Sequence, residues 1–106
     1  MKTNVYLKST KGLFNARGIY TAERTIVLRG SKISVAFSTS DKFKGADSVI
    51  SVRNDPTCVD EHGNVLKDCA FPSPSTAAQF VTGRSSNGYI AWRVDEKTNL
   101  KRFVGK

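Results

Sequence analysis

The sequence lacks any long run of apolar residues. Its most apolar stretches, residues 25–28 and 34–37, fall far short of the roughly 20 residues that a membrane-spanning helix needs. The N-terminus carries Lys2, but the apolar segment of a secretory signal does not follow it. The sequence therefore predicts a protein without membrane contact, and we expect a cytoplasmic location.

Cysteine is also scarce, with two residues in the chain, Cys58 and Cys69. Two cysteines are too few for a disulfide scaffold, and a chain of 106 residues can bury a core without one. We therefore expect both thiols to be reduced. A single bridge between them, across a turn at residues 60–64, is the alternative.

The side chains that bind metals or act in catalysis are few. The one histidine, His62, lies between Cys58 and Cys69, but the spacing differs from that of paired zinc ligands, and a fourth strong ligand is missing. A histidine in a polar turn is more simply solvated than a general base. The sequence therefore predicts no metal site and no catalytic thiol.

Complete motifs of enzymes are absent as well. The letters at residues 18–20 are the first half of the GIY-YIG nuclease motif, but Ala91 stands where a second half, Tyr-Ile-Gly, would end. No glycine-rich phosphate-binding loop is present. We expect no enzyme activity, no cofactor and no small-molecule substrate.

Positive charge is what the chain has in excess. Lys and Arg number 17 against 9 Asp and Glu, a net charge of +8. The net charge is +6 over residues 1–37, −2 over residues 38–72 and +4 over residues 73–106. If the two basic ends pack together, they form one positive surface that attracts a polyanion. Solubility alone is the alternative explanation.

The residue pattern predicts one α+β domain over residues 1–106. Three β-rich runs, 4–9, 13–21 and 24–28, are separated by turns and predict an N-terminal antiparallel β-meander. In the second run Ala16 and Gly18 alternate with Asn15 and Arg17, as in a strand with one covered face. Residues 33–37 either continue the sheet or turn a corner.

One or two short helices and a C-terminal β-hairpin are expected next. Apolar residues within 41–52 recur at helical spacing, namely Phe43, Ala46, Val49 and Ile50. Ser73 and Pro74 predict a helix start, and Gly83 a stop after Thr82. Residues 58–66 suggest a short hairpin. Residues 89–94 and 100–104 predict the terminal hairpin, with a helix starting at Gly88 as the alternative.

The most distinctive segment covers residues 73–92. It has a structural interpretation, in which glycines allow positive φ and Phe80 and Trp92 lie in the core. It also has a functional one, in which the loop at residues 84–87 presents donors to a phosphate or a base edge. Aromatic residues elsewhere alternate with basic ones and could stack on bases or fill the core: Tyr6, Tyr20, Tyr89 and Trp92.

This segment resembles a bacterial family classed as a domain of unknown function, with the signature S-P-S-x-A-A-x-x-x-x-G-R-S-x-N-G-x-x-x-W. Residues 13–20 and 27–32 resemble that family's A-x-G-x-Y and V-x-x-G-S stretches, so the resemblance covers nearly the whole chain. The family is often attached to GIY-YIG endonucleases and restriction-associated proteins, and similar wording occurs in the RAMA domain. The resemblance implies a role in DNA recognition and carries over Gly30, Ser31, Lys32, Arg84, Ser85, Asn87, Gly88 and Trp92.

Together these observations predict a non-catalytic accessory module that binds nucleic acid, with DNA favoured. The alternative is a protein-interaction module that docks a partner enzyme, with the charge incidental. The residues expected to contact nucleic acid are Arg84, Ser85, Ser86, Asn87, Gly88, Lys32, Arg17, Arg29, Arg93 and Lys101.

Overall fold

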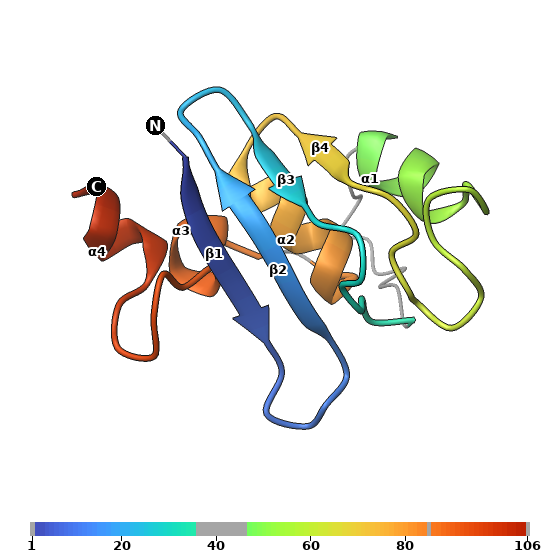
Figure 1. Ribbon diagram of the computed structural model, residues 1–106, viewed down its shortest axis with the longest axis horizontal. Coiled ribbons are helices and arrows are strands. Elements are labelled where there is room, and N and C mark those ends of the chain that lie inside the picture. Colours follow the sequence, from blue (N-terminus) through green and yellow to red (C-terminus); the bar gives the residue numbers. More distant parts are fainter. Residues whose placement is uncertain (1, 36–46, 85, 106) are drawn as a thin grey trace.

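A four-stranded antiparallel sheet forms the front layer of the molecule (Figure 1). A computed structural model describes residues 2–35, 47–84 and 86–105. The strands are β1 (Thr3–Lys8), β2 (Asn15–Tyr20), β3 (Thr25–Val27) and β4 (Cys69–Phe71), in the order β1-β2-β3-β4. The predicted meander is confirmed. The three-residue β4 was not predicted, because so short a strand carries almost no periodicity.

The two faces of the sheet differ as the alternation of residues requires. One face is buried and includes Val5 and Leu7 of β1 and Ala16 of β2. Their neighbours along the strands point to the other side and are exposed, as Tyr6 and Arg17 are. The α+β class follows from this one-sided burial, because helices cover only the apolar face.

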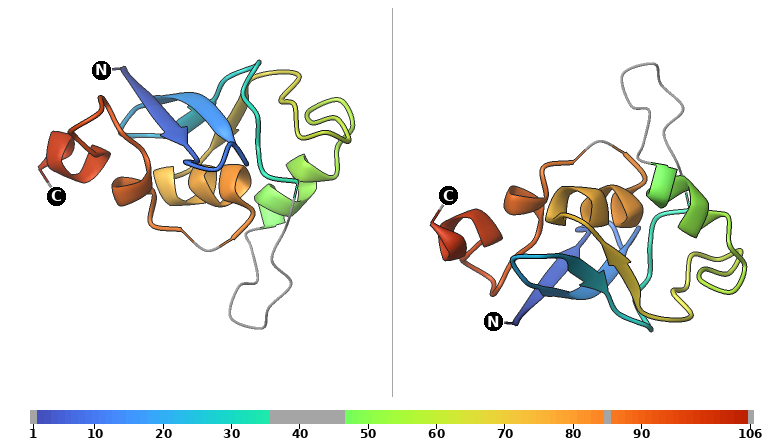
Figure 2. Two further views of the ribbon diagram at one scale, coloured as in Figure 1. Left: turned by 90° about the horizontal axis from the view of Figure 1, so that it is seen from below. Right: turned by 90° about the horizontal axis from the view of Figure 1, so that it is seen from above.

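Four helices accompany the sheet: α1 (Asp47–Arg53), α2 (Pro74–Thr82), α3 (Gly88–Ala91) and α4 (Leu100–Val104). Figure 2 shows α2 against one face of the sheet, with α1 and α3 beside it on the same side. In the same figure α4 lies beyond the edge of β1, and none of the described helices covers the other face.

Helix α2 has the predicted bounds, and its caps explain them. The Ser73 hydroxyl accepts a hydrogen bond from the Thr76 amide (3.2 Å), and Gly83 ends the helix in the left-handed region (φ 76°). Phe80 and Val81 are fully buried against the sheet layer. Phe80 lies 4.9 Å from Phe71 of β4, measured between ring centroids.

Helix α1 agrees in part with the prediction over 41–52. It spans Asp47–Arg53, whereas Phe43 and Ala46 lie outside the described residues. Val49 is buried as expected, but Ile50 is 38% exposed, so the buried stripe is narrower than predicted.

The predicted C-terminal β-hairpin is wrong, because α3 and α4 occupy much of its two segments, and the alternative of a helix starting at Gly88 is confirmed. Asn87 caps α3 by accepting from the Tyr89 amide (3.1 Å), and Asn99 caps α4 by accepting from the Arg102 amide (2.9 Å). Gly105 then ends α4 with φ 76°. Only single antiparallel bridges remain of the strand pairing, from Arg93 to Asn99 and from Arg93 to Tyr6. Four short helices therefore stand where one or two were expected.

The core lies between the sheet and α2. Trp92 is fully buried, and its indole Nε1 donates to the Pro74 carbonyl (3.0 Å), so its predicted core role is confirmed. Residues 58–66 fold back as expected, through one bridge between Val59 and Val65. Within the described ranges, no helix is long and apolar enough to cross a membrane.

Candidate functional site

The uncovered side of the sheet gathers basic side chains from four separate segments. We call it the open face and define it by Tyr6, Lys8, Asn15, Arg17, Lys32 and Arg93. All six side chains are exposed, and Tyr6 is 45% exposed despite its size. The open face joins the basic N-terminal third of the chain to a residue of the basic C-terminal third.

Strand register arranges these side chains in two rows across the sheet. Tyr6 of β1 pairs with Arg17 of β2 on one side and bridges to Arg93 on the other. Paired residues of an antiparallel ladder point to the same face, so the aromatic ring lies between two guanidinium groups. In the second row, Lys8 pairs with Asn15, which bridges to Lys32.

The positive charge of the open face is not neutralised by neighbouring carboxylates. Arg17 donates from Nη2 to the Arg29 carbonyl (3.4 Å), which places Arg29 next to the face. Asp68 lies close by, but it accepts a hydrogen bond from the Arg29 amide (2.8 Å) and makes no ion pair. Among the described residues, the one ion pair joins His62 to Glu61, away from this face. The open face carries four cations, Lys8, Arg17, Lys32 and Arg93, against the Asp95 and Glu96 carboxylates of an adjoining hollow, so it still attracts an anion.

Two hollows adjoin the open face and share Arg93. The first, of about 330 Å³, is lined by Tyr6, Lys8, Ala91, Arg93, Asp95 and Glu96, and combines an aromatic ring with carboxylates. The second, of about 350 Å³, is lined by Arg93, Lys97, Asn99, Lys101 and Arg102, and four of these five residues are cations. A hydrogen bond from the Lys97 amide (2.8 Å) lowers the pKa of the Asp95 carboxyl, so Asp95 is ionised at neutral pH.

The loop between α2 and α3 holds most of the remaining residues expected to bind nucleic acid. The Ser86 hydroxyl lies 2.9 Å from the Thr82 hydroxyl, the Asn87 side chain caps α3, and the Gly88 amide donates to the Ser75 hydroxyl (3.0 Å). Arg84 is exposed. Ser85 lies outside the described residues. Most described polar groups of this loop are therefore engaged in the fold itself.

The structure separates the predicted site residues into two groups. Arg17, Lys32 and Arg93 lie on the open face with Arg29 beside them, and Lys101 lies in the adjoining hollow. The described residues of this loop, 84 and 86–88, run along the side of α2 that faces away from the sheet (Figure 2). One ligand of modest size cannot contact both groups.

Five residues were not among the predicted nucleic-acid contacts: Tyr6, Lys8 and Asn15 of the open face, and the cations Lys97 and Arg102 of the adjoining hollow. The alternation of Tyr6 and Lys8 with the apolar Val5 and Leu7 was the signal for the first two. Lys97 and Arg102 lie on this surface only because the chain reverses at residues 93–99. The sequence did not predict where this reversal would place them.

The two thiols are buried and free. Burial and the neighbouring Cys58 raise the pKa of the Cys69 thiol to about 11, so it is a poor nucleophile at neutral pH. The His62 side chain is 76% exposed and lies in a turn that the Asp60 carboxylate holds through Asn64. In the part of the chain that the structure describes, no three His, Cys, Asp or Glu side chains gather as a metal site would require.

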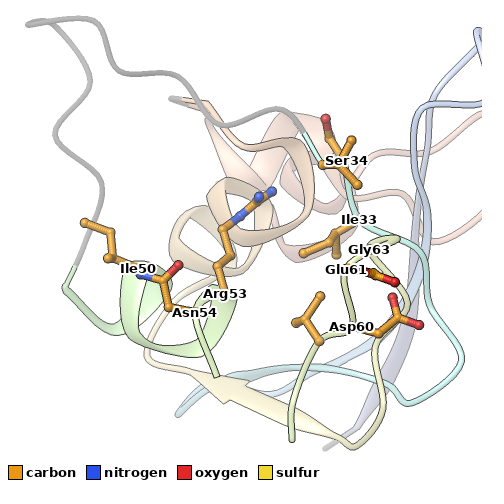
Figure 3. A pocket seen from close by; sticks show the side chains of 10 residues that line it. Ile33, Ser34, Ile50, Arg53, Asn54, Asp60, Glu61 and Gly63 are labelled. Carbon is orange, nitrogen blue, oxygen red and sulfur yellow. The ribbon is translucent and has the colours of Figure 1, made fainter. Parts of the chain in front are cut away.

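A further hollow of about 330 Å³ lies between α1, the segment at residues 33–35 and the turn at residues 60–63 (Figure 3). Arg53 lines it and donates from Nε to the Phe80 carbonyl (3.0 Å). Burial lowers the pKa of Arg53 to about 10, which still leaves it charged at neutral pH. Because Asp60 and Glu61 face the same hollow, its charge is mixed and selects no anion.

Comparison with known proteins gives one match. The model of a family described as a domain of unknown function, DUF4357, matches residues 5–104. Neither a curated protein nor a solved structure matches the chain. The matched residues include β2, β3, β4, the last four residues of β1 and the four helices α1–α4. They also include the residues that line both hollows next to the open face.

Proposed function

The chain belongs to the DUF4357 family of domains of unknown function, and on that premise we propose that it is a non-catalytic module that binds nucleic acid, DNA in particular, through the open face. The observation that carries this proposal is the cluster of Lys8, Arg17, Lys32 and Arg93 on one uncovered sheet surface without an ion-paired carboxylate among the described residues.

The energetics favour a polyanion over a single small anion. The net charge of +8 attracts any anion, but only a polyanion releases several counterions when several of these side chains bind at once. The two rows are two residues apart along the strands, about 7 Å, and so suit successive phosphates of one chain better than one isolated group. Asn15 adds a side chain that can donate to or accept from a base or a sugar.

A restriction-modification or nuclease context is the finer part of the proposal. The resemblance of residues 73–92 to domains attached to GIY-YIG endonucleases, and to the RAMA domain, supports it. A separate enzyme would then cut or modify the DNA that this domain binds. We also propose that the domain works in the cytoplasm, where the free thiols of Cys58 and Cys69 remain reduced.

Fluorescence anisotropy with labelled DNA and RNA tests the proposal. We expect salt-sensitive binding by the native domain, and a loss of about 10-fold or more in affinity for the double variant Arg17→Ala/Lys32→Ala, because charge-assisted hydrogen bonds contribute about 1.5–3 kcal/mol each. Arg84→Ala, compared with Arg17→Ala alone, is the matched control, because each removes one exposed cation and Arg84 does not belong to the open face. Equal losses in Arg17→Ala and Arg84→Ala would mean that binding depends on net charge alone. No binding of the native domain to any nucleic acid at low salt would refute the proposal.

Docking of a partner protein is the second candidate function, and the hollow of Figure 3 favours it. Val35 is 68% exposed and Ile50 is 38% exposed, and both line that hollow beside Arg53. Exposed aliphatic side chains beside a partly buried arginine are typical of a protein contact. Salt-tolerant binding to one protein, weakened by Ile50→Asp, would favour this function.

A further inference from the structure

The two hollows that share Arg93 differ in chemistry in the way that the two halves of a nucleotide differ. We infer that they form a subsite for one nucleotide of an unpaired strand, with the base stacked on Tyr6 and the adjacent phosphate held beside Arg93 by Lys97, Lys101 and Arg102. This inference rests on the proposed function and specifies the form of nucleic acid that the open face takes.

The first hollow is suited to a base. The Tyr6 ring is 45% exposed on a flat sheet surface and offers a face for stacking. Asp95 and Glu96 line the same hollow, and carboxylates accept hydrogen bonds from exocyclic amino groups of bases. The same carboxylates repel a phosphate. A volume of about 330 Å³ is at the lower end of the range of small-ligand pockets, which suits a single base.

The second hollow is suited to a phosphate. Among the described residues, four cations and Asn99 line it, and the Asp95 carboxylate of the neighbouring hollow acts on Arg102 and offsets part of this charge. The Asn99 side chain already accepts from the Arg102 amide (2.9 Å), which fixes the start of α4 and so the positions of Lys101 and Arg102. Four like charges around one hollow repel one another, and a bound anion relieves that repulsion.

Backbone pairing fixes the geometry between the two hollows. The Arg93 amide donates to the Tyr6 carbonyl (2.8 Å), and the Tyr6 amide donates to the Arg93 carbonyl (2.7 Å). The two residues are therefore held side by side on the open face, and Arg93 lines both the base hollow and the phosphate hollow. Arg17, on the far side of Tyr6, is placed to contact the next phosphate along the strand.

The described helices argue against insertion into duplex DNA. The major groove admits a helix, but α2 carries no Lys or Arg and none of its residues is exposed. Helix α1 contributes one basic side chain, that of the partly buried Arg53. Helix α4 has only five residues. Stacking on the exposed Tyr6 ring requires a base that is unstacked from its neighbours, as in a single strand.

The test compares three labelled ligands by anisotropy titration: single-stranded DNA, single-stranded RNA, and a DNA hairpin whose stem contains the single-strand sequence in paired form. We expect the single strands to bind more tightly than the duplex. Tyr6→Leu should weaken single-strand binding about 10-fold, whereas Tyr6→Phe should keep it, because stacking needs the ring and not the hydroxyl. Tyr6 lies on an exposed strand position, and unchanged circular dichroism and melting temperature verify that both variants fold.

The variant Lys101→Ala/Arg102→Ala distinguishes the contribution of the phosphate contacts from that of base stacking. This variant should lower the salt slope of log K for single strands by about 1.4, because each phosphate contact contributes about 0.7. Tyr6→Leu should leave that slope unchanged. Equal duplex and single-strand affinity with no effect of Tyr6→Leu would overturn the subsite and leave the proposed function standing. Failure of every nucleic acid to bind native protein at low salt would overturn both.

Discussion

Gly88 illustrates how a residue in a conspicuous motif can be required by packing. A Cβ atom built at this position would overlap the backbone carbonyl of Pro74 and the amide of Ser75. The Gly88 amide also donates to the Ser75 hydroxyl (3.0 Å). Gly88 therefore allows the start of α3 to lie directly against the start of α2, and its place next to Asn87 does not by itself indicate a ligand.

Gly88→Ala should destabilise the domain by about 3 kcal/mol or more, because neither backbone can move without disturbing a helix start. Gly12→Ala is the control: nothing lies within 4 Å of its added Cβ, and only its φ of +74° makes the change costly, by about 1–2 kcal/mol. Urea denaturation followed by Trp92 fluorescence compares the two. A smaller loss for Gly88→Ala than for Gly12→Ala would contradict the packing account.

Trp92 makes the same point for an aromatic residue. The motif left it open whether this ring fills the core or stacks on a base. Full burial and the hydrogen bond to the Pro74 carbonyl assign it to the core. Tyr6, in contrast, is exposed among cations, although it lies outside the motif.

At the scale of elements, capping decided which short segments became helices. Residues 100–104 include the strand formers Phe103 and Val104, yet Asn99 and Gly105 supply both ends of a helix. Tertiary contacts add to this, because Leu100 is fully buried and its amide donates to the Trp92 carbonyl (2.8 Å). In a segment of five residues, two caps and one buried side chain outweigh β propensity.

The same reasoning applies to α2, where Ser73 holds the start of the helix. Ser73→Ala should lower stability by about 1 kcal/mol, because the Thr76 amide loses its acceptor. Thermal unfolding should then shift by about 4–8 °C. Ser51→Ala is the control, because Ser51 is exposed within α1. An equal or larger effect of Ser51→Ala would mean that the cap does not hold α2.

At the scale of the whole molecule, the fold converts a charge imbalance along the chain into a surface. The basic ends meet where Arg93 pairs with Tyr6 along the edge of β1, and the acidic middle lies toward α1 and the turn at residues 60–63. Figure 1 shows α4 and the start of β1 on the same side of the molecule, far from α1. The net charge of +8 is therefore polarised as well as large.

If five to seven of the cations on and beside the open face bind phosphates, log K for a single strand should fall with log salt with a slope of about −3 to −5. Anisotropy titrations of the native domain over a range of salt concentrations measure it. A slope near zero would mean that the open face does not bind phosphates and that the charge serves solubility.

The sequence by itself determined the meander, α2 with both its caps, the α+β class and the basic character of the two ends. These features depend on contacts between near neighbours in the chain, such as strand alternation and the Ser73 and Gly83 caps. The grouping of site residues could not be read in this way. Local chemistry makes Arg84 and Arg93 look alike, and both are exposed.

Tertiary structure decided which of these residues share a surface. The pairing of Tyr6 with Arg93 joins residues 87 positions apart, and the burial of Trp92 removes the aromatic residue of the motif from any ligand. Both depend on how the C-terminal segment packs along β1, which non-local burial determines and short-range propensity does not. The sequence thus specified the charge and the fold class, and packing specified where the charge is displayed.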